Sequence, residues 1–209
     1  EVERIQVTIL LQQADGSLEP VPPEREFNPG EIVKVGIECN VPAYVYIVNF
    51  ASSGKKTVIF PEGNESNLLE ANKLHTLPQS YDLVFEGKKG FETFQVFVSR
   101  ERIAFLDTAV HSQKGELNAE QTRAIAEMWK DDNRPQQPGI TSNEDTSRDP
   151  RFDKKAKTTV RFPRFDPVFD KKTRTTTITG APGRQQGSQD RSSRIIPFRI
   201  NLRNTGGQK

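Results

Sequence analysis

The chain has 209 residues, of which 33% are hydrophobic, so it predicts one or two domains with less apolar content than a wholly globular chain. Residues 1–130 hold 13 Lys and Arg against 19 Asp and Glu, a net charge of −6, and residues 131–209 hold 17 against 9, a net charge of +8. The single cysteine, Cys39, excludes an internal disulfide, and no apolar run approaches the ~20 residues of a membrane span.

The first 113 residues predict a series of short strands. Residues 31–39 alternate apolar and polar side chains, and residues 44–50 are nearly all apolar, as in a central strand that is buried on both faces. Gly and Pro turns separate these runs from further candidate strands. This spacing predicts a mainly β fold, an antiparallel β-sandwich. The further strands are expected at residues 4–12, 56–60, 81–86 and 91–99.

Residues 117–130 change to a helical period. Asn118 followed by Gln121 predicts a capping box at the start of this helix. Ile125, Met128 and Trp129 then recur at helical spacing and form an apolar face. We expect this face to dock on the chain's own sandwich, with a partner protein as the alternative.

Residues 133–209 are sparse in apolar side chains and predict an extended, basic tail. Residues 149–159 recur as residues 166–176, with eight of the eleven positions identical at an offset of 17. An Asp-Pro pair and an Asp-Lys-Lys turn precede a Thr-rich, β-branched run in each copy, which indicates two similar hairpin or strand elements. A third β-like run spans residues 194–202. We therefore expect a sandwich at residues 1–116, a helix on it at 117–132, and the tail at 133–209.

The charge division predicts that the tail binds an acidic surface: the chain's own body, a neighbouring copy, a nucleic acid or an anionic membrane. The β-branched runs favour strand addition to the sheet edge of a neighbouring subunit. The residues expected to make that contact are Thr158, Val160, Phe162, Thr175, Thr177, Ile178, Ile195, Ile196, Phe198 and Ile200. Electrostatic docking is expected from Lys154, Lys155, Lys171, Lys172 and Arg174.

Residues 27–103 carry an ordered set of motifs: Phe27-Asn28-Pro29-Gly30-Glu31, the run from Ala43 to Asn49, and Val58-Ile59-Phe60-Pro61. They resemble a bacterial family of domains of unknown function, found appended to caspase-like peptidases, serine/threonine kinases and cell-envelope proteins. The resemblance implies a small β-sandwich with a sensing or interaction role. It brings no catalytic residue that could be transferred to this chain.

The polar residues form no recognisable catalytic or metal-binding motif. His75 and His111 have neither zinc-ligand spacing nor the neighbours of a nucleophile relay. The acidic residues 61–67 lack the spacing of an EF-hand, so a solvated loop is expected there. We expect no catalytic residue, no metal and no cofactor.

These observations favour a non-enzymatic structural or interaction subunit of an extracellular or cell-envelope assembly, in which contacts that do not close would form a filament. Export is expected because the chain begins with Glu1, as after removal of a signal peptide, although a trimmed recombinant chain would begin in the same way. The alternative is a peptide- or glycan-binding sensor module with a tethering tail. Nucleic-acid binding through Arg161-Phe162-Pro163-Arg164-Phe165 is a third possibility.

Overall fold

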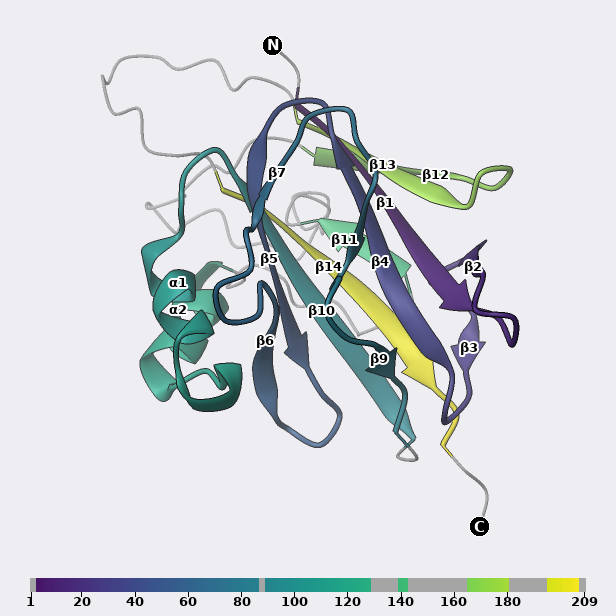
Figure 1. The fold of residues 1–209 in the computed structure, drawn as a ribbon, viewed down its shortest axis with the longest axis horizontal. Helices are drawn as coiled ribbons and strands as arrows, with labels where there is room; N and C mark the ends of the chain where they lie inside the picture. The colour runs from purple at the N-terminus through teal and green to yellow at the C-terminus, as the bar shows by residue number, and fades with distance from the viewer. Residues whose placement is uncertain (1–2, 87–88, 129–138, 143–164, 181–194, 207–209) are drawn as a thin grey trace, which may run out of the picture.

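A computed structural model of the chain describes residues 3–86, 89–128, 139–142, 165–180 and 195–206. Two β-sheets pack face to face, and two short helices cover the outer face of the second sheet (Figure 1). The fold is therefore mainly β, an antiparallel sandwich, as the strand spacing predicted. Among the described residues, no helix is long and apolar enough to cross a membrane.

The first sheet has the strand order β12-β13-β1-β4-β8, with β2 also beside β1 and β9 also beside β4. Apolar residues alternate along its central strand, where Val33, Val35 and Ile37 are each at most 1% exposed. Such alternation places one face of a strand on the core. The strands of this sheet are β1 (Glu3–Gln12), β2 (Leu18–Val21), β4 (Ile32–Cys39), β8 (His75–Leu77), β9 (Leu83–Val84), β12 (Phe165–Asp170) and β13 (Thr175–Gly180).

The second sheet has the order β11-β14-β10-β5-β6, with β3 also beside β14 and β7 also beside β5. Val45 and Ile47 of β5 face the core between the sheets, whereas Tyr46 and Val48 face the helices. This strand is buried on both faces, which explains its nearly continuous apolar sequence. The strands are β3 (Glu26–Phe27), β5 (Ala43–Phe50), β6 (Lys56–Phe60), β7 (Leu68–Leu69), β10 (Gly90–Ser99), β11 (Gly139–Ser142) and β14 (Ile195–Asn204).

The helices α1 (Ala104–Val110) and α2 (Ala119–Met128) form a second core with the outer face of this sheet. Leu106 of α1 and Ile125 of α2 are at most 1% exposed there. The Tyr46 hydroxyl donates a 2.6 Å hydrogen bond to Asp107 Oδ1 and accepts one of 3.1 Å from the Ile103 N–H. Because this buried hydroxyl is paired twice, it fixes the start of α1 on β5.

Helix α2 begins with the capping box that the sequence predicted, whereas α1 was not predicted. The expected capping box is present, because the Gln121 N–H donates to Asn118 Oδ1 at 2.8 Å and the Asn118 N–H donates to Gln121 Oε1 at 2.9 Å. Helix α1 was not expected, since residues 1–113 were interpreted as strands alone. Its 7 residues hold buried positions at Leu106, Ala109 and Val110, a helical spacing that is short and easily missed.

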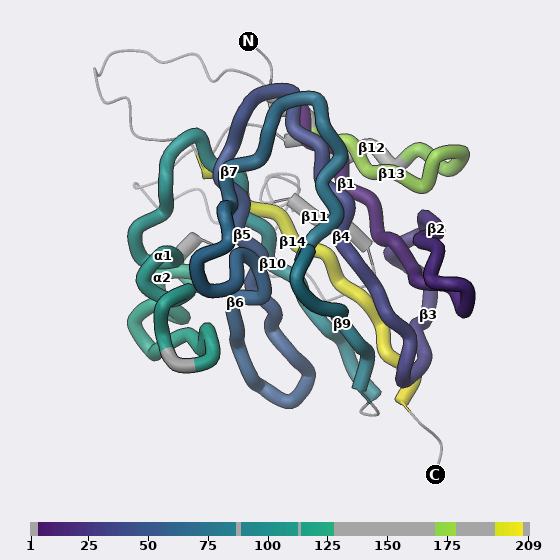
Figure 2. The backbone as a smooth tube through the Cα atoms, viewed as in Figure 1, coloured from purple at the N-terminus to yellow at the C-terminus, as the bar shows by residue number. Residues whose placement is uncertain are grey.

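The last described strand lies inside the sandwich rather than outside it. Figure 2 traces the yellow C-terminal strand β14 along β10. The two strands are antiparallel over their whole lengths, from Gly90 opposite Asn204 to Ser99 opposite Ile195. The hairpin of β12 and β13 extends the first sheet, with Glu3 opposite Gly180 and Thr8 opposite Thr175. The boundary expected at residue 133 therefore does not separate these strands from the body.

Candidate interaction groove

A groove of about 750 Å³ lies between β6 of the second sheet and β9 of the first. Figure 1 shows where these two strands lie in the fold. Apolar residues from both sheets line it, among them Ile59 and Val84. Ile59 is 7% exposed, whereas Val84 is 53% exposed. The groove thus combines a buried apolar wall with an accessible apolar rim, and its volume is in the range of about 300–1,000 Å³ that ligand sites occupy.

Hydrogen bonds join the two walls of the groove directly. The Tyr81 hydroxyl, from the segment before β9, donates to the backbone carbonyl oxygen of Ile59 in β6. Burial, with smaller contributions from the Glu62 and Glu65 carboxylates, raises the pKa of Tyr81, so the phenol keeps its proton and remains a donor. A second bond between the same segments runs from Ser80 Oγ to Glu62 Oε2 at 3.0 Å. These contacts fix the spacing of the two edges.

Lys34 of β4 holds the segment that carries Tyr81. Its side chain is only 11% exposed, and Nζ donates hydrogen bonds to the backbone oxygens of Pro78, at 3.0 Å, and Tyr81. Nζ also lies 3.0 Å from Asp82 Oδ1. A buried ammonium group needs such partners to offset its lost hydration, so Lys34 ties this wall of the groove to the first sheet.

The groove carries more negative than positive charge. Its carboxylates are Glu62, Asp82, Glu86 and Glu92, and its ammonium groups are Lys55 and Lys114. Lys55 lies 3.3 Å from Glu116, and Glu92 accepts a 3.0 Å hydrogen bond from Asn49 Nδ2. Glu62 and Glu86 are exposed, so they are available to a cation that enters the groove.

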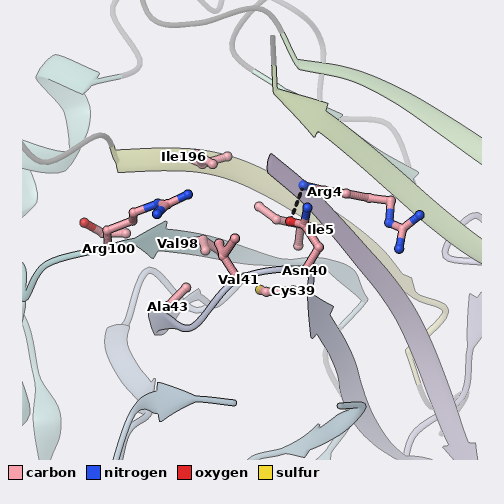
Figure 3. A pocket seen from close by; sticks show the side chains of 10 residues that line it. Arg4, Ile5, Cys39, Asn40, Val41, Ala43, Val98, Arg100 and Ile196 are labelled. Carbon is pink, nitrogen blue, oxygen red and sulfur yellow. Dashed lines mark hydrogen bonds between the residues drawn. The ribbon is translucent and has the colours of Figure 1, made fainter. Parts of the chain in front are cut away.

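A second hollow, at the opposite end of the sandwich, is too small to hold a ligand. It has a volume of about 10 Å³, roughly that of one water probe. Figure 3 shows Val98 and Ile196 beside it, with the Arg4 N–H donating to Asn40 Oδ1 at 2.7 Å. Cys39 also lines this hollow and is 1% exposed, which agrees with its interpretation as a small buried side chain.

The structure corrects the target expected for the tail strands. The residues of β14 that were expected to contact a neighbouring subunit are part of the chain's own core: Ile196, Phe198 and Ile200 are at most 3% exposed. Ile195 of the same strand is partly buried against the second core, beside the helices. In β13, Ile178 is 0% exposed between the sheets. Ile178, Ile196, Phe198 and Ile200 therefore belong to the core between the two sheets of the same chain.

Five other residues were expected to contact a neighbouring subunit, and two of them lie in the described part of the chain. Thr175 and Thr177 lie on β13, where both are half-buried, and the hydroxyls of Thr175 and Thr8 are 3.1 Å apart. Thr158, Val160 and Phe162 lie outside the described residues.

The residues expected to dock by charge lie mainly at the turn between β12 and β13. Arg174 Nη1 lies 3.3 Å from Glu19 Oε1 on β2, so this cation pairs with the chain's own acidic body. Lys171 and Lys172 are exposed at the same turn. Lys154 and Lys155 lie outside the described residues, as does the first copy of the repeat.

The hairpin expected for the second copy of the repeat is present, but its turn begins at Asp170. Asp170 Oδ1 accepts a 2.8 Å hydrogen bond from the Lys172 N–H, which with Thr173 lowers the pKa of this carboxyl. Asp166 and Pro167 were expected in a turn, but they lie within β12. Proline is tolerated there because β12 is the edge strand of its sheet.

The three residues expected to dock the helix lie partly inside and partly outside the described part of the chain. Ile125 packs in the second core of the same chain, as expected for docking on its own sandwich. Met128 is the last residue of α2. Trp129 lies outside the described residues.

Sequence reasoning did not identify Lys34, Tyr81 or Val84 as residues of a site. Lys34 was counted only as the polar member of an alternating strand. The interruption of the apolar run 81–86 by Asp82 was the available signal, since a carboxylate there can pair with a cation on the next strand. The groove itself is formed by strands that lie far apart in the sequence, so no local pattern encodes it.

Of the comparisons with known proteins, only the one with protein families gave a match, and it covers residues 26–102. Curated proteins and solved structures gave no match to the chain. The segment that supplies both groove walls, β6 and β9, lies inside the region that resembled a known family. Residues 26–102 match the family described as Domain of unknown function (DUF4384), which confirms that resemblance for this segment of the chain.

Proposed function

We propose that the protein is a non-enzymatic interaction subunit of an extracellular or cell-envelope assembly, and that its groove binds an extended segment of a neighbouring copy. The observation that carries the proposal is the groove of about 750 Å³ between β6 and β9. The location outside the cytoplasm is an expectation from the sequence and enters the proposal only as the setting of the assembly.

The groove suits an extended polypeptide because a sheet edge forms one of its walls. Among the described strands, β9 pairs with β4 alone, so its other edge has no strand beside it. The edge of β6 is already used, because Thr57 bridges to Glu116 and the Leu117 N–H donates to the Lys56 carbonyl oxygen at 3.1 Å. An unpaired edge is a template for strand addition, with alternate side chains of the added strand filling the groove.

The position of β14 defines how the proposal must be tested. Removing residues 133–209 would also remove Phe198, Ile200 and Leu202, each 0% exposed in the core. That truncation would unfold the sandwich. Only the full chain with point substitutions can separate association from folding.

The test is the mass of the full chain by light scattering over a concentration series. We expect association that Val84→Arg weakens, because this substitution places a long charged side chain on the rim of the groove. Leu68→Arg is the matched control, since Leu68 on β7 is 48% exposed and does not line the groove. A parent chain that stays monomeric, or a Val84→Arg variant that associates like the control, would contradict the proposal.

The peptide- or glycan-binding alternative uses the same groove but a different ligand. It predicts a monomeric chain at every concentration, together with saturable binding of an unrelated peptide or glycan that Val84→Arg weakens. The same mass measurement therefore separates the two functions.

A further inference from the structure

The two copies of the repeat give the groove a specific candidate ligand. In the second copy, Asp170 forms the turn, Arg174 pairs with Glu19, and β13 adds to the edge of β1. This copy shows what the sequence pattern does: it places a β-branched strand along a sheet edge and a cation on a neighbouring carboxylate. The first copy keeps eight of eleven positions.

The first copy of the repeat is not suited to the sheet edge that β13 occupies. At the position where β13 buries Ile178, the first copy has a charged residue. Thr176 and Ile178 of β13 are 3% and 0% exposed. At an offset of 17, the residue in the position of Ile178 is Arg161. An arginine in that buried site would lose its hydration without a partner. The first copy is therefore suited to a different sheet edge.

Its alternation fits the groove at β9. In an extended segment, Thr158, Val160 and Phe162 project to one face, and Lys157 and Arg161 project to the other. The apolar face matches the wall that includes Ile59, and the cations match the exposed carboxylates of the groove. Residues 149–164 carry six Lys and Arg against two Asp, a net charge of +4. The groove has the opposite sign.

We propose that residues 149–164 of one copy bind in the groove of a second copy, as a strand added along β9 with its cations facing Glu62 and Glu86. This inference rests on the proposed function and names its ligand. The groove and residues 149–164 are different surfaces of the chain. After one contact forms, the first copy still has a free groove and the second copy still has a free segment. Such a head-to-tail contact closes into a ring, of which a reciprocal dimer is the smallest, or grows into a filament.

The experiment is a charge swap in the full chain, read by light scattering over concentration. The groove variant is Glu62→Lys with Glu86→Lys, and the segment variant is Lys157→Glu with Arg161→Glu, the two cations on the face opposite Val160. We expect each variant alone to associate roughly tenfold more weakly or worse, because like charges then face each other. A chain that carries all four substitutions is expected to regain association, and its mass should rise with concentration as that of the parent chain does.

The matched control is Glu24→Lys with Glu120→Lys, which makes the same change in net charge at exposed residues outside the groove. It should associate as the parent chain does. Far-UV circular dichroism and the melting temperature check that every variant is folded.

Two results would overturn the inference. The first is loss of association in the groove and segment variants without recovery in the fourfold variant, and the second is an equal loss in the control. If Val84→Arg weakens association while the charge swap fails, the groove remains the interaction site and only the ligand assigned here falls. If the parent chain never associates, the proposed function falls as well.

Discussion

Arg174 and Glu19 are separated by 155 residues, yet Nη1 of the arginine lies 3.3 Å from Oε1 of the glutamate and donates a 2.7 Å hydrogen bond to the Pro20 carbonyl oxygen. The basic C-terminal part of the chain therefore meets the acidic N-terminal part within one molecule. The two side chains are 43% and 55% exposed, so water screens their attraction. Their pairing indicates where the hairpin of β12 and β13 is placed more than how stable it is.

This gives the first prediction. A double-mutant cycle of Arg174→Ala and Glu19→Ala, measured by urea unfolding, should give a coupling energy of about 0.2–1 kcal/mol, as exposed pairs do. The coupling should shrink in 1 M salt. A coupling energy above about 2 kcal/mol would show that the pair is far more important to the fold than its exposure allows.

The second prediction concerns the central position of β14. Phe198→Ala should destabilise the whole chain by about 3–5 kcal/mol, because Phe198 is 0% exposed between the sheets and its removal leaves a cavity. Chemical unfolding followed by far-UV circular dichroism should show the loss. Arg203→Ala on the same strand is the control, since its side chain is 45% exposed, and it should cost less than about 1 kcal/mol. Equal effects of the two substitutions would contradict the placement of β14.

The third prediction concerns Lys34. Lys34→Met keeps most of the side-chain volume but leaves the buried oxygens of Pro78 and Tyr81 without a donor, which costs about 1–3 kcal/mol for each unsatisfied group. We expect lower stability and faster backbone hydrogen exchange in residues 79–86. Lys73→Met is the control, since Lys73 pairs at the surface with Glu70. Unchanged exchange in residues 79–86 of Lys34→Met would show that Lys34 does not hold this wall.

The fourth prediction follows from Tyr81. Its pKa is raised in the folded state, and an unfolded tyrosine ionises near pH 10, so its contribution to stability is complete below about pH 10 and is lost as the pH rises above it. Between pH 8 and pH 11, the parent chain should therefore lose more unfolding free energy than Tyr81→Phe does. Equal losses in both proteins would mean that the Tyr81 phenol is not buried against Ile59.

The sandwich could be predicted because each of its main strands has a recognisable pattern in consecutive residues. The alternation of Val33, Val35 and Ile37 specifies the inward face of β4, and the apolar run of β5 specifies a strand covered on both sides. The capping box of α2 needs only Asn118 and Gln121. These features depend on neighbouring residues and on the period of the pattern.

The destination of the tail could not be predicted in the same way. The β-branched residues of β13 and β14 indicate strands, but a sheet edge in the same chain and one in a neighbouring copy offer the same backbone groups. The burial of Ile178 and Phe198 decides the question in favour of the same chain for these two strands. The groove was missed for a related reason, because Tyr81 and Ile59 meet only after both sheets have formed.

The strands β13 and β14 complete the sandwich within one chain, and we propose that the groove at β9 is left for a second copy. Hydrogen–deuterium exchange of the full chain at low and at high concentration tests both statements together. We expect residues 195–204 to be protected at both concentrations, and residues 81–86 to gain protection only at the high concentration. Rapid exchange of residues 195–204 at low concentration, with protection appearing only on association, would contradict this expectation, because β14 would then be donated between copies.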